Sequence, residues 1–302
     1  MNKFAKQAFT LIELLVVIAI IGILSSLIVV SMSGVTNKAS IAKGQVFANS
    51  LRNALMLDIA GEYKFDELST AINTTAIQDS WGSINNGTLY TGADPAVNKL
   101  STDCISGKCL YFDGVDDYIS LPINLINISN NFTISIWIKK IDKGAVLDND
   151  RIFSFVVDAN NGLQFTLDNT TGKYGIFLIR SGVSTINQLT YGVYDVNNWV
   201  HLLYTVDGSS GSFYKNGVLT NSDGSASIGN GATFNYSIGR RSDALATTFF
   251  NGYIDDIRIY DVAIPTSQIK ENYYLGLNSL LANGNISKEE YKQRLANSLA
   301  SK

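Results

Sequence analysis

A long apolar stretch near the N-terminus constrains this chain more than any other feature. Residues 9–30 are almost wholly apolar, and one carboxylic acid, Glu13, lies among them. A stretch of this length matches the ~20 residues that an α-helix needs to cross a bilayer. The leader of residues 1–8 is polar and carries two lysines, which favour a cytoplasmic location for it. The sequence therefore predicts a single membrane-spanning helix that sends everything after residue 30 outward.

A cleavable secretory signal peptide is the alternative interpretation of this stretch. Such a peptide has a shorter apolar core, and the small residue at its cleavage site follows that core. Here the small residue, Ala8, precedes the apolar run. Burying Glu13 in hydrocarbon costs about 2.5–3.5 kcal/mol, so we expect its carboxylate to have a partner.

The residues around Ala8 carry a family resemblance. Residues 8–14 read Ala-Phe-Thr-Leu-Ile-Glu-Leu, an order that resembles the prepilin cleavage and methylation motif of type IV pilins and pseudopilins. The resemblance implies that a prepilin peptidase cuts after Ala8 and methylates the new N-terminus at Phe9. It also implies that Glu13 serves assembly, by pairing with the N-terminal amine of a neighbouring pilin-like subunit.

Two positions depart from the pilin pattern. Ala8 stands where the family usually has glycine, and Val30 stands where many major pilins have proline. Without that proline we expect an unkinked helix, which favours a minor pilin or pseudopilin over a standard major pilin. Helical spacing of apolar residues continues to residue 57, and Gly61 is a natural stop. We therefore expect a transmembrane and assembly helix over residues 9–60.

The pattern changes from helical to alternating after Gly61. Residues 132–138 place an apolar side chain at every second position, as a half-buried strand does. The pair Asn216–Gly217 is typical of a type I′ turn between two hairpin strands. Many such segments separated by turn residues predict an antiparallel β-sandwich. Further strands are expected at residues 151–157, 162–167 and 174–179.

Short segments spread over residues 61–274 resemble, in order, a LamG-like (concanavalin A-like) jelly-roll domain. The strength of this resemblance lies in the order and completeness of the segments, and it implies a jelly-roll head. The segments are residues 63–67, 79–82, 86–89, 110–114, 117–119, 132–137, 199–202, 214–217 and 251–260.

The tail of residues 275–302 has helical spacing. Gly284 ends a first helix, and Ser287 with Glu290 forms a capping box that starts a second helix reaching about Ala300. A helical hairpin packed on the sandwich is one expectation. The tail also resembles short SHOCT-type segments, which implies a role in oligomerisation or membrane association. The predicted fold is thus mainly β, with a long N-terminal α-helix, the sandwich and a short helical hairpin.

The sequence offers little support for catalysis. Glycosidase chemistry needs two carboxylates about 5–10 Å apart, and no short motif presents such a pair, so we expect no enzyme and no catalytic residue. The only histidine, His201, lies in an apolar strand, where a packed core residue is expected rather than a catalytic base. A two-histidine metal site is excluded. The net charge of −3 offers no basic surface for nucleic acid.

Three aspartates are candidate metal ligands. Period two puts Asp255 on the same face as Ile257 and Ile259, and Asp117 likewise shares parity with apolar neighbours. Buried carboxylates need partners such as backbone amides, arginine or a hard cation. LamG-like domains often hold calcium, so the resemblance implies Asp113, Asp117 and Asp255 as calcium ligands. Turn capping by these side chains is the alternative.

Cys104 and Cys109 are close in sequence, in a segment that we expect to be exported. Two nearby cysteines outside the cytoplasm usually pair. The sequence therefore predicts a local disulfide, with two reduced thiols as the alternative.

These features combine in a pilin-like subunit, a type IV pilin or pseudopilin, that displays a LamG-like adhesion head outside the cytoplasmic membrane. Its expected partners are prepilin peptidase, other pilin-like subunits, the membrane, and a carbohydrate or protein ligand on a surface. Tyr90, Tyr191 and Tyr194 lie in loop-like stretches where a ring can stack on a sugar, with core packing as the alternative. The competing hypothesis is a membrane-anchored carbohydrate-binding protein that uses the pilin signal only for export.

Overall fold

The computed structural model describes residues 12, 14–21, 58–68, 76–122, 125, 131–142, 150–158, 161–168, 172–180, 183–224, 235–242 and 248–300. The chain divides into two compact units, Met1–Asn53 and Ala54–Lys302. In the first unit, residues 14–21 are helical, and their aliphatic side chains are exposed. None of the described helices combines the length and the apolar character that crossing a membrane requires. Ala8, Phe9 and Glu13 lie outside the described residues.

The second unit opens with a strand. β1 (Ile59–Tyr63) pairs antiparallel with β16 (Asn251–Tyr260). Its last residue, Tyr63, is fully buried in the core of the unit. Residues 59 and 60, which were expected in the N-terminal helix, therefore lie in a strand, because they extend sheet pairing with β16.

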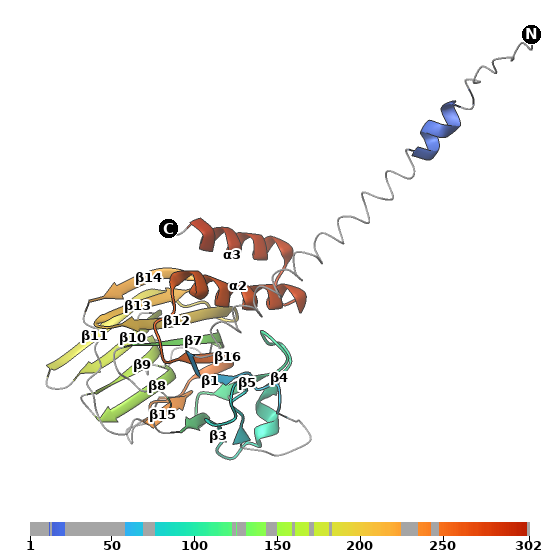
Figure 1. Cartoon of the computed structure of the whole chain (residues 1–302). Coiled ribbons are helices and arrows are strands. Elements are labelled where there is room, and N and C mark those ends of the chain that lie inside the picture. The colour runs from blue at the N-terminus through green and yellow to red at the C-terminus, as the bar shows by residue number, and fades with distance from the viewer. Residues whose placement is uncertain are drawn as a thin grey trace, which may run out of the picture. The chain divides into compact units, whose positions relative to one another are not determined.

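Two antiparallel sheets, each of eight strands among the described residues, form a sandwich (Figure 1). We call them sheet A and sheet B. Sheet A follows the order β14 (Val218–Asp223), β13 (Ser210–Lys215), β12 (Trp199–Asp207), β7 (Asn131–Lys140), β16, β5 (Cys109–Asp113) and β4 (Leu100–Ser101), with β1 also on β16. Sheet B follows the order β11 (Val183–Val193), β10 (Lys173–Arg180), β9 (Asn161–Asp168), β8 (Asp150–Asp158), β15 (Asn235–Ile238), β6 (Tyr118–Leu121), β3 (Gly87–Tyr90) and β2 (Ala76–Ile77). A 3₁₀ helix, η2 (Ala96–Lys99), precedes β4.

The apolar core lies between the two sheets. Alternate residues of each strand point into it, and aromatic rings meet edge to face there, as Phe153 of β8 does with Phe165 of β9 at 6.3 Å between centroids. The predicted sandwich and the predicted strands at 151–157, 162–167 and 174–179 are confirmed in β8, β9 and β10. The predicted apolar face of β7 is also confirmed, with the core residues Phe132, Ile134, Ile136 and Ile138.

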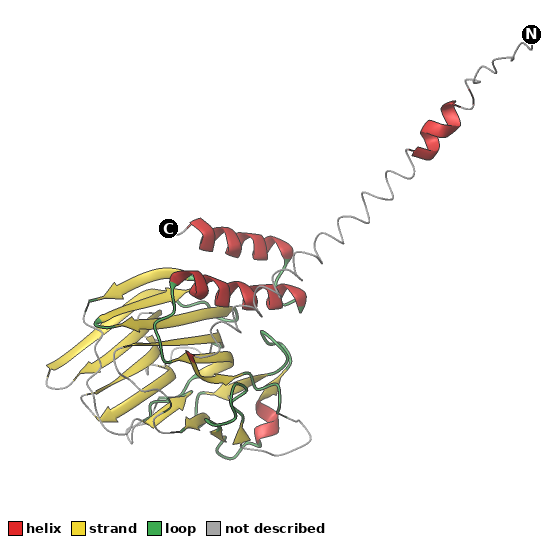
Figure 2. Ribbon diagram, viewed as in Figure 1, coloured by secondary structure: helices red, strands yellow, loops and turns green. Residues whose placement is uncertain are grey.

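A pair of helices forms a third layer on the outer face of sheet A (Figure 2). They are α2 (Thr266–Ala282) and α3 (Lys288–Ala300). The amide of Glu290 donates to Ser287 Oγ at 3.1 Å, as the predicted capping box requires. The predicted helical hairpin is confirmed, although α2 begins well before the expected boundary at residue 275 and belongs to the same compact unit as the sandwich.

The predicted turn between β13 and β14 is also present. Asn216 and Gly217 have φ values of 53° and 73°, the left-handed conformations of a type I′ turn. Asn216 Oδ1 accepts a hydrogen bond from the amide of His201 at 3.0 Å, which ties this turn to β12.

A bulge in β16 changes which side chains share a face. The register of β16 against β7 shifts by one residue between Asp255 and Arg258, and Asp256 takes a left-handed φ of 48° there. Ile257 and Ile259 point into the inter-sheet core, whereas Asp255 points away from it, toward a loop that contacts its carboxylate. The prediction that Asp255 shares a face with the two isoleucines was wrong, because the bulge breaks the period of two.

The fit of α2 on sheet A depends on a glycine. A Cβ on Gly276 would lie 2.4 Å from Cζ2 of the fully buried Trp137. Gly276→Ala should therefore lower the free energy of unfolding by about 1–3 kcal/mol, the usual cost of overpacking, although alanine favours the helix. Urea unfolding measures this change. Gly224→Ala is the matched control, because a Cβ there meets nothing within 4 Å; equal stability of the two variants would contradict the packing argument.

Candidate functional site

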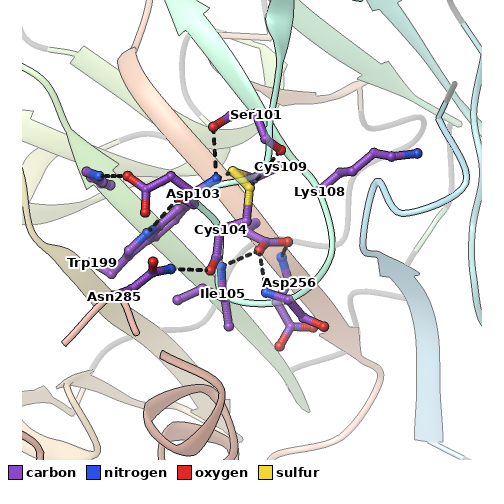
Figure 3. Close-up of a disulfide and its surroundings, with 12 residues drawn as sticks. Ser101, Asp103, Cys104, Ile105, Lys108, Cys109, Trp199, Asp256 and Asn285 are labelled. Atoms are coloured by element: carbon purple, nitrogen blue, oxygen red, sulfur yellow. Dashed lines mark hydrogen bonds and ion pairs between the residues drawn. A yellow bond between two sulfur atoms is a disulfide. The ribbon is translucent and has the colours of Figure 1, made fainter. Parts of the chain in front are cut away.

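Cys104 and Cys109 form a disulfide with 2.06 Å between the sulfur atoms, which confirms the predicted pairing. Both cysteines are buried, and they close a short loop between β4 and β5. We call residues 103–109 the disulfide loop (Figure 3). Backbone amides and carbonyls of this loop form hydrogen bonds with several neighbouring elements, so the loop connects parts of the head.

The carboxylate of Asp255 is bound by the disulfide loop. Its Oδ2 accepts from the amides of Ile105 at 2.9 Å and Ser106 at 3.2 Å, and its Oδ1 accepts from the amide of Asp256 at 2.7 Å. Burial raises the pKa of Asp255 well above its usual range, and the nearby Asp256 raises it further, while the amide donors oppose the shift. From the sequence, backbone amides, arginine or a hard cation were possible partners of this carboxylate, and the structure shows backbone amides.

The disulfide loop also holds the helical pair. In Figure 3, Asn285, from the turn between α2 and α3, donates to the carbonyl of Cys104 at 2.8 Å. Asn283 donates to the carbonyl of Ile105 at 3.1 Å, and the indole of Trp199 in β12 donates to the carbonyl of Asp103 at 3.3 Å. One loop therefore joins sheet A to the helical layer.

Asp113 and Asp117 lie together, around a buried lysine. Lys99 Nζ lies 2.9 Å from Asp117 Oδ2 and 3.5 Å from Asp113 Oδ2, and it also lies 3.1 Å from Asp94 Oδ2. Although burial alone lowers the pKa of Lys99, its bonds to Asp117 and Asp94 raise it above its usual value. The cluster thus contains its own cation.

The three predicted calcium ligands do not form one group. Asn251 of β16 lies opposite Asp113, and Asp255 lies four residues further along the same strand, which is about 13 Å at ~3.3 Å per residue. The carboxylates near Asp113 are those of Asp116 and Asp117. Asp255 is therefore not a shared ligand with the other two, because strand geometry separates them.

His201 is a packed core residue, as expected. It is fully buried, its Nε2 lies 2.7 Å from Ser135 Oγ, and its ring lies 5.1 Å from that of Trp137. Burial lowers the pKa of His201 to about 3, with a smaller contribution from Arg258. The imidazole is neutral at physiological pH and is covered by α2, where Tyr273 stacks on it.

The outer face of sheet B carries a stack of two tyrosines and an arginine. Tyr90 of β3 and Tyr118 of β6 are opposite each other, with their rings nearly parallel and 4.5 Å apart. The guanidinium of Arg240 lies 3.4 Å from the centroid of Tyr118. Arg240 reaches this face because Gly239 before it has a φ of +86°, which reverses the alternation after β15. We call these three residues the tyrosine–arginine stack.

A row of polar side chains crosses sheet B beside this stack. Their neighbours along each strand lie in the inter-sheet core, so the polar side chains point outward. Exposure increases along the row, from buried residues in β9, β8 and β15 to a half-buried residue in β6 and an exposed one in β3. In register order the row is Gln164, Ser154, Ser237, Ser120 and Thr88. Its accessible end therefore coincides with the tyrosine–arginine stack.

Sequence reasoning identified only part of this surface. Tyr90 was a candidate ring, and it lies in a strand rather than a loop, with 45% of its surface exposed. Tyr194 packs on Tyr174 and the core instead, and the side chain of Tyr191 lies outside what the structure describes. Tyr118 and Arg240 were missed. The alternation in residues 118–121 could have placed Tyr118 outward, but nothing in the sequence pairs it with Arg240.

Comparison with known families agrees with this architecture. Residues 113–270, just over half of the chain, match the concanavalin A-like lectin/glucanases superfamily, and the chain belongs to that family. Residues 3–29 match the prokaryotic N-terminal methylation motif. The protein therefore combines a pilin-type N-terminus, which a prepilin peptidase processes, with a concanavalin A-like domain. No curated protein sequence matches the chain.

Several solved structures share the fold. Domain 4 of AbnA, an extracellular GH43 arabinanase from Geobacillus stearothermophilus, has 21% identity and a TM-score of 0.56, with 72% of this chain and 98% of that domain covered. The binding domain of Paraclostridial Mosquitocidal Protein 1 has 16% identity and a TM-score of 0.55, with coverages of 74% and 53%. Trypanosoma rangeli sialidase has 15% identity and a TM-score of 0.50, with coverages of 70% and 32%. At these identities the likeness establishes the fold alone, and the chain spans about half or less of the last two.

Loss of the disulfide should loosen the helical layer. In a Cys104→Ser/Cys109→Ser variant we expect the free energy of unfolding to fall by about 2 kcal/mol, as loop closure of this length predicts. Because the loop holds Asn283 and Asn285, amide exchange should rise in the α2–α3 turn, which hydrogen-exchange mass spectrometry measures. Asn285→Ala keeps the disulfide and should raise exchange in that turn alone. Unchanged exchange in the double variant would contradict the role of the loop as a connector.

Proposed function

We propose that this protein is a pilin-like subunit that displays a carbohydrate-binding head outside the cytoplasmic membrane. The methylation motif supports membrane association and export through a pilin-type machine. The observation that carries the binding role is the tyrosine–arginine stack at the accessible end of the row of polar side chains on sheet B. Aromatic faces pack on the C–H groups of sugar rings, and hydroxyl and amide side chains bond to sugar hydroxyls.

The arrangement favours an extended sugar chain over a single buried ring. The stack and the accessible end of the row lie on the surface of a sheet, across β3 and β6. Arg240 is only partly buried, and its guanidinium brings a positive charge to the tyrosine rings. An acidic group on the ligand would suit that charge. The arabinanase domain was solved in complex with arabinotriose, so the fold can hold a short sugar chain.

The interactions of the acidic residues favour a head that binds sugar without hydrolysing it. Among the described residues, Asp255 is bound by backbone amides, Asp117 pairs with Lys99, and Glu62 and Asp256 pair with Arg258. Carboxylates committed in this way are poor candidates for the acid and nucleophile of a glycosidase. We therefore propose an adhesion role and no enzymatic one.

The second candidate is a membrane-anchored carbohydrate-binding protein that uses the pilin signal only for export. The atypical Ala8 and the missing proline at Val30 favour this candidate, or a minor subunit, over a major pilin. The composition of filaments separates these roles, because a major subunit is abundant in them, a minor one is scarce, and an anchored protein is absent.

Tyr90→Ala should weaken sugar binding about two- to tenfold, because a ring contact contributes roughly 0.5–1.5 kcal/mol. Binding is measured on a glycan array with arabinan, glucan and sialylated oligosaccharides, and affinity for the best probe then follows by calorimetry. Tyr253→Ala is the matched control, because Tyr253 forms a similar pair with Tyr111 on sheet A. The proposal fails if no probe binds the wild type, or if both variants lose affinity equally.

Glu13→Gln should remove the protein from sheared filaments and leave it in the membrane fraction, because the uncharged amide cannot form an ion pair with a neighbouring N-terminal amine. Immunoblots of both fractions with an antibody against the head measure this change. Ala8→Gly is the control and should be processed and assembled at least as well as the wild type. A wild-type protein that never enters filaments would favour the anchored alternative.

A further inference from the structure

Lys99 occupies the centre of an acidic cluster at one end of the sandwich. Its ammonium reaches Asp117 at 2.9 Å, Asp94 at 3.1 Å and Asp113 at 3.5 Å, and its side chain is only 3% exposed. A buried ammonium is costly unless carboxylates compensate it. These contacts join η2 to the segment between β5 and β6, so the lysine ties two parts of the head together.

Backbone amides also bind two oxygens of the cluster. Asp113 Oδ1 accepts from the amide of Val115 at 2.8 Å, and Asp117 Oδ2 accepts from the amide of Asp113 at 2.7 Å. Asp117 Oδ1 is buried without a hydrogen-bond partner among the described residues. The geometry is that of a turn closed around an ion pair.

Calcium does not fit this arrangement. A calcium ion takes six to eight oxygen ligands at about 2.3–2.6 Å, whereas one oxygen each of Asp113 and Asp117 already faces the Lys99 ammonium and Asp113 Oδ1 already accepts from a backbone amide. A second cation among them would lie next to a buried positive charge. Asp255, the third ligand expected from sequence, is about 13 Å away along β16.

We infer that the Lys99 ammonium takes the place of the calcium ion that the LamG-like resemblance implies. The lysine offsets part of the negative charge of Asp113 and Asp117 and ties the turn before β6 to η2 without a metal. The head is therefore stable in the absence of calcium. Without the lysine, the turn depends on another cation for its stability. This inference is independent of the ligand that the head binds.

The test compares melting temperatures of the detergent-solubilised full-length protein in EDTA and in millimolar calcium. The wild type should melt at the same temperature in both. Lys99→Met should melt about 10 °C lower in EDTA, as the loss of one partner of a buried pair predicts, and calcium should raise its melting temperature. Lys139→Met is the matched control, because Lys139 pairs with a single exposed aspartate, and it should change little.

If Lys99→Met does not fold, Lys99→Met/Asp117→Asn removes both charges and should recover part of the lost stability. Two results would overturn the inference. One is calorimetric calcium binding to the wild type, with a rise in melting temperature of about 5 °C or more. The other is a Lys99→Met variant as stable in EDTA as the wild type.

Discussion

Every residue of β12 from Trp199 to Val206 is buried, and β7 is nearly as closely covered. Successive side chains of a strand point to opposite faces, so sheet A needs an apolar cover on both sides. Sheet B provides one cover and α2 provides the other, with Tyr273 stacked on Trp137 at 5.8 Å between ring centroids. Gly276 lets the helix approach that indole closely. The helical layer is therefore a requirement of the sheet it covers, and a sandwich of two layers would leave these rings exposed.

The disulfide loop extends this cover and joins it to the strands. It gives two amides to Asp255 on the sheet side and two carbonyls to Asn283 and Asn285 on the helix side. A buried carboxylate without such donors would be costly. The loop thus satisfies a charged group and anchors a helical turn with the same few residues, which couples the fold to the formation of the disulfide.

Features determined by local pattern were predictable. The Asn216–Gly217 turn, the Ser287 cap of α3 and the alternation in β7 depend on residues that are neighbours in sequence, and the structure confirms all three. Features that depend on distant residues were not. One bulge at Asp256 reversed the predicted face of Asp255, and the partner of Asp117 proved to be a lysine from η2. Nothing local to residue 117 indicates which cation the fold will bring there.

The difference between the outer faces of the two sheets also bears on the proposed function. Helices cover the central strands on the outer face of sheet A, whereas on sheet B the polar row becomes accessible at β3 and β6. Asp117, whose carboxylate Lys99 neutralises, directly precedes Tyr118 in the tyrosine–arginine stack. The ion pair therefore sets the position from which the ring of Tyr118 projects. On this view a turn held by an ion pair and backbone hydrogen bonds prepares the aromatic surface before any ligand arrives, which lowers the entropy that binding must overcome.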